Sequence, residues 1–416
     1  MIKEIFPSEV KGEVYAPASK SYAQRAVAIS ALAHGESILR NIDSCNDIDA
    51  AVSVVRNLGA SVEIKGRECV VYGGPIHAEG AVLNIGESGL ETSLFTPVET
   101  SMNVLHTVTG TGSILKRPVG MMEEPLRALG VKISSNKGFL PIELQGKIKG
   151  GELTIDGSLS SQFLTGLLIT LPLAETDSVI HVKGLRSRPY IDMTIEVLRA
   201  FGVRVENENY ESFYIKGNQH YRPQCYNVEG DWSGASCLLV AGAIAGEVSV
   251  CNLNPHSLQA DKAILHALDY AGAGLSLEWD KVTISKAPLV GFSFDATDCP
   301  DLFPALIALA VNCSGQTVLM GTNRLKHKES DRAHALTAIY KAMGAEIDNS
   351  YENVMVIRGG GLKGGVTVDS FNDHRIAMSA AVAALTSENP VSVTRAECVN
   401  KSYCRFWDDL EKIQCK

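Results

Sequence analysis

The stretch GEVYAPASKSYAQRAVAISALAHGESILRNIDSCNDIDAAVSVVRNLGASVEIKGRECVVYG, residues 12–73, decides the fold because its pattern recurs along the chain. An alternating strand pattern leads into a helix of small residues, and a second strand leads into an amphipathic helix and two further strands. The stretch therefore predicts one βαβαββ unit. Gly59 follows the amphipathic helix, as expected for a C-cap, because glycine adopts left-handed backbone angles at little cost.

Two series of residues repeat at this period. Amphipathic helices end in glycine at steps of 71, 72, 70 and 72 residues, at Gly59, Gly130, Gly202, Gly272 and Gly344. Polar groups open the small-residue helices at SKS (19–21), ESG (87–89), SSQ (160–162), DWS (231–233), CPD (299–301) and NDHR (372–375). Six copies predict an α/β (α+β) protein of two globes, with three units in each globe around a pseudo-threefold axis.

The repeats also predict domain boundaries. We expect one globe at residues 13–227 and the other at 1–12 plus 228–416, with a two-strand hinge near 13–20 and 227–231. The sixth copy ends at FWDDLEKIQCK before its last strands, and MIKEIFP at residues 1–7 has the pattern to supply one of them. The N-terminal strand is therefore expected to close the second globe.

Composition limits the function. The chain has 416 residues and a net charge of −9, so it lacks the overall basic character of a nucleic-acid binder. We see no apolar run of membrane-spanning length and no secretory signal, and the ten cysteines are scattered without metal-type spacing. These features favour a cytoplasmic protein with reduced thiols, no metal and no membrane contact.

The charged residues that open the helices are the candidate functional residues. Lys20 stands where a helix should begin, although a cation there opposes the helix dipole by about 0.3–1 kcal/mol. Each basic residue taken singly is most simply a solvated charge. A bound anion explains why so many gather at equivalent places, at Lys20, Arg25, Arg117, Lys328, Arg332, Arg375 and Lys401. Asp301 and Glu329 stand among them, either as a helix-terminal acid and an ion-pair partner or as groups that transfer protons.

Six blocks then point to a family. SKSYAQR, SSQFLTGLL, RPYIDM, HKESDR, FNDHRIAM and NKSY resemble, in order, the blocks of the 5-enolpyruvylshikimate-3-phosphate synthase family. The resemblance implies a two-globe inside-out α/β barrel. It also implies transfer of the enolpyruvyl group of phosphoenolpyruvate to the 5-hydroxyl of shikimate 3-phosphate, with release of phosphate, in the shikimate pathway to chorismate and aromatic amino acids. We expect a monomer with these two small-molecule substrates and no cofactor.

The resemblance also implies residue roles. Shikimate 3-phosphate should be held by Lys20, Ser21, Arg25, Ser160, Ser161, Gln162, Ser187, Tyr190, Asp301 and Lys328. Phosphoenolpyruvate should be held by Lys20, Gly89, Arg117, Gln162, Arg332, Arg375 and Lys401. Asp301 should accept the hydroxyl proton and Glu329 should protonate the methylene carbon, and whether Lys20 shares in proton transfer stays open.

One block departs from the family pattern. GESGLETS at residues 86–93 stands where the family usually shows GNSGTTxR, so Glu87, Leu90 and Ser93 replace asparagine, threonine and arginine. An acid near a bound carboxylate predicts weaker phosphoenolpyruvate binding and altered sensitivity to glyphosate-like inhibitors. The alternative is that Glu87 caps its own helix. Arg324 also replaces a family asparagine, and we expect it still to reach an anion.

Three other functions compete with this one. A sister enzyme transfers enolpyruvate to UDP-N-acetylglucosamine, but it has asparagine after the lysine where this chain has Ser21, and KRPVG here lacks the sister enzyme's loop cysteine. A catalytically impaired anion-binding homologue is supported only by the altered second block. RNA terminal-phosphate cyclases share a related repeat but are disfavoured by the acidic charge.

Overall fold

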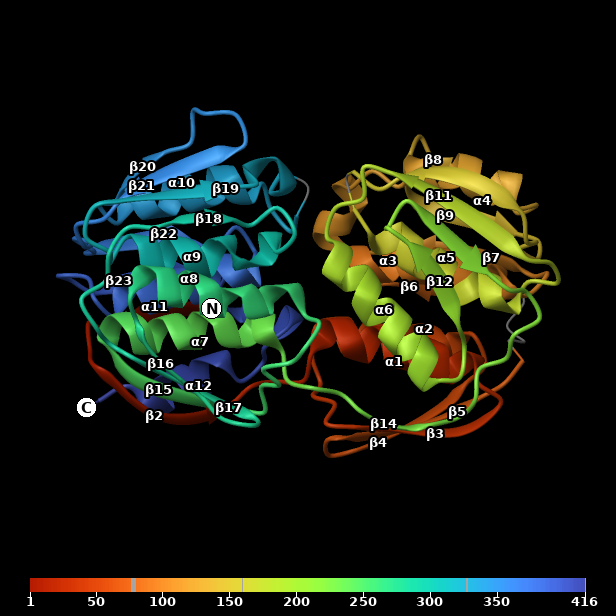
Figure 1. Cartoon of the computed structure of the whole chain (residues 1–416), viewed down its shortest axis with the longest axis horizontal. Coiled ribbons are helices and arrows are strands. Elements are labelled where there is room, and N and C mark those ends of the chain that lie inside the picture. The colour runs from red at the N-terminus through yellow and green to blue at the C-terminus, as the bar shows by residue number, and fades with distance from the viewer. Residues whose placement is uncertain (76–79, 159, 327, 416) are drawn as a thin grey trace. The chain divides into compact units, whose positions relative to one another are not determined.

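A computed structural model describes residues 1–75, 80–158, 160–326 and 328–415. The chain forms two compact units (Figure 1). The central unit is Lys20–Val228, and the split unit joins Met1–Ser19 to Glu229–Lys416. Residues 13–19 therefore belong to the same unit as repeats four to six, and the chain passes between the units at 19–20 and 228–229.

The central unit contains three repeats and one added strand. The first repeat comprises α1 (Lys20–Leu32), β3 (Gly35–Arg40), α2 (Asn46–Asn57), β4 (Ser61–Lys65) and β5 (Glu68–Gly73). The second comprises β6 (Val82–Asn84), α3 (Gly89–Val98), β7 (Leu105–Thr109), α4 (Glu123–Ala128), β8 (Lys132–Asn136) and β9 (Phe139–Gln145). The third comprises β10 (Glu152–Asp156), α5 (Gln162–Thr170), β11 (Ser178–Lys183), α6 (Arg188–Ala200), β12 (Val205–Glu208) and β13 (Ser212–Ile215), and β14 (Cys225–Asn227) follows. Short 3₁₀ turns are η1 (Glu99–Ser101), η2 (Gly112–Lys116), η3 (Gly120–Met122) and η4 (Leu171–Leu173).

The split unit repeats the same order. It begins with β1 (Ile2–Ile5) and β2 (Val10–Tyr15), and its fourth repeat continues with α7 (Trp232–Ala245), β15 (Gly246–Cys251), η5 (Ala260–Ala263), α8 (Ile264–Ala271), β16 (Gly274–Leu277) and β17 (Lys281–Ser285). The fifth has β18 (Ser293–Asp295), η6 (Pro300–Leu302), α9 (Phe303–Ala310), β19 (Gln316–Met320), η7 (Thr322–Arg324), α10 (Arg332–Ala342), β20 (Glu346–Asp348) and β21 (Val354–Arg358). The sixth has β22 (Val366–Asp369), α11 (His374–Ala384), β23 (Val391–Thr394), η8 (Ala396–Lys401) and α12 (Phe406–Ile413).

Each repeat builds one small mixed sheet. In the second repeat β6 pairs parallel with β7, and β9 pairs antiparallel with both β7 and β8, giving the order β6-β7-β9-β8. The first pair is parallel because α3 crosses over between its strands, whereas β8 and β9 form a hairpin. The third and fifth repeats show the same order. The predicted βαβαββ unit is confirmed.

Two strands are exchanged relative to the sequence interpretation. The strand GEVYAPA was expected to open the first repeat, but β2 pairs parallel with β15 of the fourth repeat. Conversely, β14 was expected to open the fourth repeat and instead pairs parallel with β3 of the first. In Figure 1 the red β2 accordingly lies with the green β15, and the green β14 lies with the orange β3. At the N-terminus, β1 pairs antiparallel with β23 and completes the sixth sheet.

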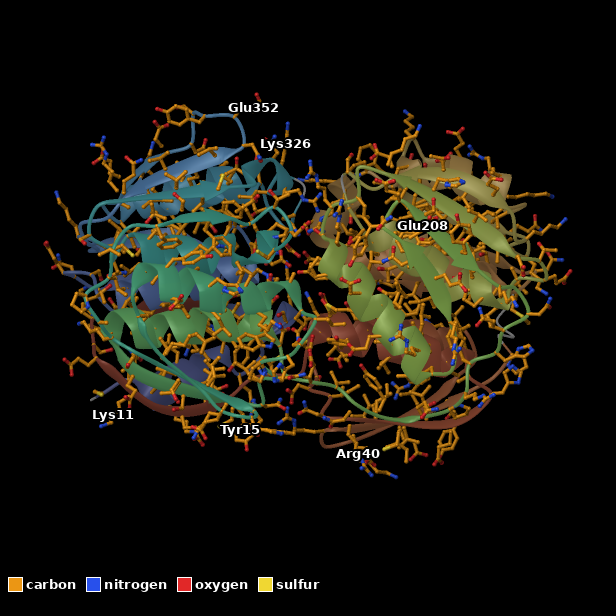
Figure 2. All side chains as sticks on the ribbon, viewed as in Figure 1. Lys11, Tyr15, Arg40, Glu208, Lys326 and Glu352 are labelled. Carbon is orange, nitrogen blue, oxygen red and sulfur yellow. The ribbon has the colours of Figure 1, made fainter. Side chains whose placement is uncertain are left out.

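The first helix of each repeat forms the core. Every residue of α9 and α11 is buried, as is α5 after its first residue, because these helices carry apolar or small residues on all sides apart from His374 and Arg375 at the start of α11. In the split unit α7, α9 and α11 pack against one another in pairs. The sheets face solvent, as the outward side chains of Lys11, Tyr15, Arg40 and Glu208 show (Figure 2). Helices inside and sheets outside agree with the inside-out barrel that the resemblance implies.

The predicted C-cap glycines adopt the expected backbone. Gly59, Gly130, Gly202, Gly272 and Gly344 have φ values of +106°, +87°, +86°, +84° and +101°. A side chain there would strain the turn that separates each amphipathic helix from its following strand. Among the described residues, no helix is both long and apolar enough to cross a membrane.

Candidate active site

Arg332, the buried first residue of α10, is the centre of a partly buried cluster that we call the arginine cluster. Its Nε donates to Asp373 Oδ2 at 2.8 Å, its Nη1 to Asp301 Oδ1 at 2.6 Å and its Nη2 to Glu329 Oε2 at 2.5 Å. The Arg332 side chain is wholly buried. A guanidinium offers donors in a fixed planar fork, so one arginine orients three carboxylates. Two of them, Asp301 and Glu329, are the acids predicted to move protons.

Further cations surround Asp301. Lys328 Nζ lies 3.2 Å from its Oδ1, and Arg375 Nη2 lies 3.5 Å from its Oδ2. Burial opposes ionisation of this carboxyl, yet Lys328, Arg375 and Arg332 together hold its pKa well below the ordinary value. Asp301 is therefore a carboxylate, and a weak base, while all these cations remain on it.

The N-terminus of α11 supports the cluster. Asp373 caps this helix by accepting a hydrogen bond from the backbone N–H of Arg375 at 3.1 Å, and it also binds Arg332. Lys401, buried at the end of η8, donates to the carbonyl of Asn372 at 2.7 Å. Arg375 and Lys401 thus lie beside the arginine cluster, and their binding of phosphoenolpyruvate stays a prediction.

Two acids near the cluster were not singled out from the sequence. Asp373 lies within the NDHR block, which pointed to it without deciding its role. Asp261 is 1% exposed, accepts a hydrogen bond from the Ser233 hydroxyl, and has its Oδ1 buried without a hydrogen-bond partner. Burial and the charge of Asp301 raise its pKa to about 6. No sequence signal marked Asp261, because its importance depends on a neighbour 40 residues away along the chain.

The central unit gathers the other predicted residues around the N-termini of its inner helices. Gly89 begins α3, and a Cβ atom there would lie 2.6 Å from Arg117 Nη1 and 3.5 Å from Gln162 Oε1. Gln162 begins α5, and its N–H donates to Ser160 Oγ at 3.1 Å. The absent side chain of Gly89 therefore lets Arg117 and Gln162 approach one helix N-terminus, the arrangement that suits an anion.

Lys20 begins α1, as predicted, and has an acidic partner that the sequence analysis missed. Its Nζ lies 2.8 Å from Asp47 Oδ2, in the first turn of α2. Glu91 of α3 is fully buried nearby, and its Oε1 accepts from Gln24 Nε2 at 2.7 Å. Burial and the charge of Asp47 raise the pKa of Glu91 well above its ordinary value. The cation at this helix start is thus balanced in part by the protein itself.

Arg25 is placed differently from a simple substrate ligand. It donates to the carbonyls of Ser21 and Tyr190 at 2.7 and 3.2 Å, and to the hydroxyls of Thr194 and Thr165 at 2.9 and 3.4 Å. The side chain is buried, and this burial lowers its pKa to about 10. Three of these four hydrogen bonds tie α1 to α5 and α6, and the bond to Ser21 lies within α1. Its binding of shikimate 3-phosphate stays a prediction.

The remaining predicted residues of this unit lie at helix starts. Ser161 is buried and is the N-cap position of α5, and Ser187 holds that position for α6 with a left-handed backbone (φ 56°, ψ 44°). Tyr190 lies in the first turn of α6 beside Arg25. A non-glycine residue with positive φ is uncommon and often marks a constrained site.

The structure shows what Glu87 of the altered second block contacts. The N-cap of α3 is Ser88, whose side chain accepts from Glu91 N, so the interpretation of Glu87 as the cap of its own helix is wrong. Glu87 Oε2 instead accepts from the backbone N–H and hydroxyl of Ser113, at 3.4 and 3.2 Å. Arg324, the other departure, lies close enough to Lys328 for its charge to lower the pKa of that lysine, after the larger effect of burial.

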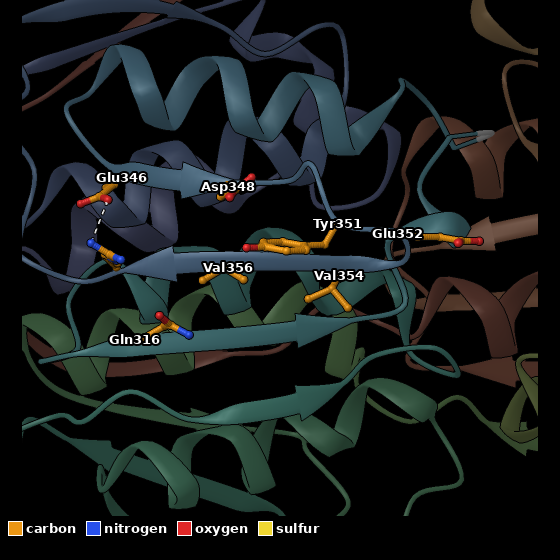
Figure 3. A pocket seen from close by; sticks show the side chains of 8 residues that line it. Gln316, Glu346, Asp348, Tyr351, Glu352, Val354 and Val356 are labelled. Carbon is orange, nitrogen blue, oxygen red and sulfur yellow. Dashed lines mark ion pairs between the residues drawn. The ribbon is translucent and has the colours of Figure 1, made fainter.

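A separate hollow of about 540 Å³ lies over the fifth sheet (Figure 3). Glu346, Asp348 and Glu352 line it together with Tyr351, and Arg358 pairs with Glu346 at 3.3 Å. The charged residues of this lining are three acids and one arginine, so the hollow does not suit the anionic substrates that the arginine cluster favours.

In each unit, arginines and lysines gather with carboxylates at helix N-termini, an arrangement typical of an α/β enzyme that acts on small anionic substrates. The sequence profile of EPSP synthase (3-phosphoshikimate 1-carboxyvinyltransferase) matches residues 6–410. The chain belongs to the EPSP synthase family.

Individual relatives agree. A 3-phosphoshikimate 1-carboxyvinyltransferase of Clostridium novyi (strain NT) is 37% identical over 99% of this chain and 97% of its own length. One of Clostridioides difficile (strain 630) is 35% identical over 99% and 97%. An EPSP synthase structure from Acinetobacter baumannii superposes with a TM-score of 0.84 at 26% identity, over 99% of this chain and 98% of that one.

Proposed function

We propose that the chain transfers the enolpyruvyl group of phosphoenolpyruvate to the 5-hydroxyl of shikimate 3-phosphate and releases inorganic phosphate. This transferase reaction belongs to the shikimate pathway, which leads to chorismate and the aromatic amino acids. The observation that carries the proposal is the arginine cluster, in which Arg332 holds Asp301 and Glu329 together beside Lys328 and Arg375. The reaction needs a base, an acid and cations for a phosphate and a carboxylate at one place.

The reaction passes through a tetrahedral intermediate. The 5-hydroxyl oxygen bonds to C2 of phosphoenolpyruvate, the hydroxyl proton passes to Asp301, and the methylene carbon takes a proton from Glu329. The bond between C2 and the phosphate oxygen then breaks, and phosphate leaves with the proton that Asp301 had accepted. The methyl group gives a proton back to Glu329, so that the double bond between C2 and C3 forms again. Lys20 remains a second candidate for this proton work.

Substrate binding would also change the basicity of Asp301. Its low pKa depends on Lys328, Arg375 and Arg332. When substrate phosphate and carboxylate groups bind the same cations, these cations stabilise the Asp301 carboxylate less, and the pKa of Asp301 rises toward the ordinary range. Asp301 would therefore become an effective base only with substrates present, which limits unproductive proton transfer.

The residues of the central unit would bind the same substrates. Gly89, Arg117 and Gln162 are assigned to phosphoenolpyruvate, and Ser161, Ser187 and Tyr190 belong to the set assigned to shikimate 3-phosphate. The proposal requires both units to act on one pair of substrates, with hinge motion near residues 13–20 and 227–231. We keep the expectation of a monomer.

The test is phosphate release from phosphoenolpyruvate, with shikimate 3-phosphate and UDP-N-acetylglucosamine as parallel acceptors. Release with shikimate 3-phosphate alone is expected. Release with the UDP-sugar would assign the sister activity. Binding of shikimate 3-phosphate without any release would mean that the altered second block has silenced the enzyme.

A further inference from the structure

The segment that precedes Arg117 is joined to the altered second block at several points. The N–H of Thr111 donates to the carbonyl of Gly86 at 2.8 Å, and Ser113 donates through its N–H and hydroxyl to Glu87. Arg117 follows η2 directly, and its own N–H donates to the carbonyl of Ile114 at 3.0 Å. The position of Arg117 is therefore set by a short turn whose first residues are attached to residues 86–87.

The approach of Glu87 to this turn depends on a glycine. Gly112 has φ +59°, and a Cβ atom there would lie 2.4 Å from Cδ of Glu87 and 2.5 Å from its Oε1. A contact of that length is a severe overlap, so a side chain at position 112 and the observed Glu87 conformation exclude each other. The observed position of the Glu87 carboxylate therefore requires glycine at position 112.

The two joined segments meet again at their other ends. Gly89 lies two residues after Glu87, and Arg117 Nη1 lies 2.6 Å from where its Cβ would be. Glu87 is half-buried, and its carboxylate accepts from Ser113 at the start of the turn. Arg117 follows the end of the same turn, and its side chain reaches Gly89. Ser113, where Glu87 is bound, lies four residues before Arg117, and η2 connects the two.

We infer that Glu87 is a positioning residue that fixes Arg117 at the N-terminus of α3 for the phosphoenolpyruvate anion. The inference rests on the proposed function for the identity of the anion. It reverses the expectation that this acid only weakens binding, because the carboxylate is bound to Ser113. A shorter asparagine side chain at this position would not span the same gap to Ser113.

The effect of removing Glu87 should be on substrate affinity. Arg117 binds an anion that is present in both the ground state and the transition state, and loss of such uniform binding raises KM with kcat unchanged. For Glu87→Ala we expect the KM for phosphoenolpyruvate to rise about tenfold, with kcat within about threefold of the parent, since small misplacements of a binding group have effects of this order or larger. Glu87→Gln keeps the acceptor oxygen and should restore most of the affinity.

A double-variant cycle separates positioning from general damage. Arg117→Ala should raise the KM for phosphoenolpyruvate more than Glu87→Ala does, and adding Glu87→Ala to Arg117→Ala should change it little further. Shikimate 3-phosphate affinity, measured by calorimetry, should be unchanged in Glu87→Ala. Glu124→Ala, which removes an exposed carboxylate from the same unit, is the matched control. Additive effects of the two alanine variants would overturn the inference.

A second readout needs no activity. The amide of Ser113 donates to Glu87, so hydrogen exchange at this amide should be about tenfold faster in ligand-free Glu87→Ala than in the parent protein, as expected for loss of a local hydrogen bond. Unchanged exchange would overturn the positioning role whatever the reaction. If the Ser113 amide exchanges faster in Glu87→Ala but the parent protein releases no phosphate with either acceptor, the positioning role of Glu87 is supported and the proposed function is refuted.

Discussion

Asp373 offers the sharpest test of how the arginine cluster is held together. It is wholly buried, binds the Nε and Nη2 atoms of Arg332 at 2.8 and 3.3 Å, and caps α11. Asp373→Asn removes the charge but keeps an oxygen that can cap the helix. Asp373→Ala removes both functions, so the two variants separate the ion pair from the cap.

The expected loss of stability can be worked out from these contacts. Breaking a buried ion pair by removing one partner costs about 3–5 kcal/mol. Asp301 and Glu329 remain on Arg332 after the substitution, which leaves part of the charge balanced. We therefore expect Asp373→Asn to lower the free energy of unfolding by about 2–3 kcal/mol, at or below the lower end of that range. Asp373→Ala should cost about 1 kcal/mol more, the usual value of an N-cap.

Urea unfolding followed by tryptophan fluorescence reports on the relevant unit. The three tryptophans, Trp232, Trp279 and Trp407, all lie in the split unit. Trp232 and Trp407 are buried, so their emission changes when this unit unfolds. Asp280→Asn at an exposed hairpin tip is the control and should change stability by less than about 0.5 kcal/mol. A loss below about 1 kcal/mol for Asp373→Asn would refute the view that its charge balances Arg332.

Three further outcomes are expected. The pKa of Asp261 is raised from 3.8 to about 6, so the folded protein holds this proton more tightly than the unfolded chain, and this group's contribution to stability is lost as the pH rises through that interval. Asp261→Asn should remove this dependence and increase stability at pH 7.5, as urea titrations at several pH values would show; an unchanged slope would contradict it. Leu90→Thr with Ser93→Arg should lower the KM for phosphoenolpyruvate more than the same pair with Glu87→Asn added; equal values would count against a separate role for Glu87. If both units hold shikimate 3-phosphate, as the proposed function requires, small-angle scattering should give a smaller radius of gyration with this ligand bound, because such binding favours closure; an unchanged radius would argue against hinge motion.

The repeat could be predicted from sequence because its signals are local. Each C-cap glycine and each alternating strand is decided by residues within a few positions, and Gly59 and Gly344 adopt the expected backbone. The exchange of β2 and β14 could not be predicted, because both segments have the same local pattern and only their distant partners, β15 and β3, distinguish them.

Part of the candidate site could also be predicted from the sequence. Asp301, Glu329 and Arg332 were expected near one another, and both acids bind the buried Arg332. The partners Asp47 and Asp373 were missed because acids at the starts of helices are common and their pairing depends on tertiary contact. The direction of the Arg25 guanidinium also depends on α5 and α6, which no local pattern describes.

Because of the exchanged strands, the two units can complete their sheets at different stages of synthesis. Every strand of the central unit lies between residues 35 and 227, so its three sheets can form as soon as β14 has left the ribosome. The split unit differs, because β1 and β2 are made long before their partners β23 and β15. β2 therefore stays unpaired until residues 246–251 have been made, and β1 until residues 391–394 have been made. A fragment of residues 20–228 retains all its sheet partners, whereas a fragment of residues 229–416 lacks one strand in each of two sheets and would need the N-terminal segment added back as a separate peptide.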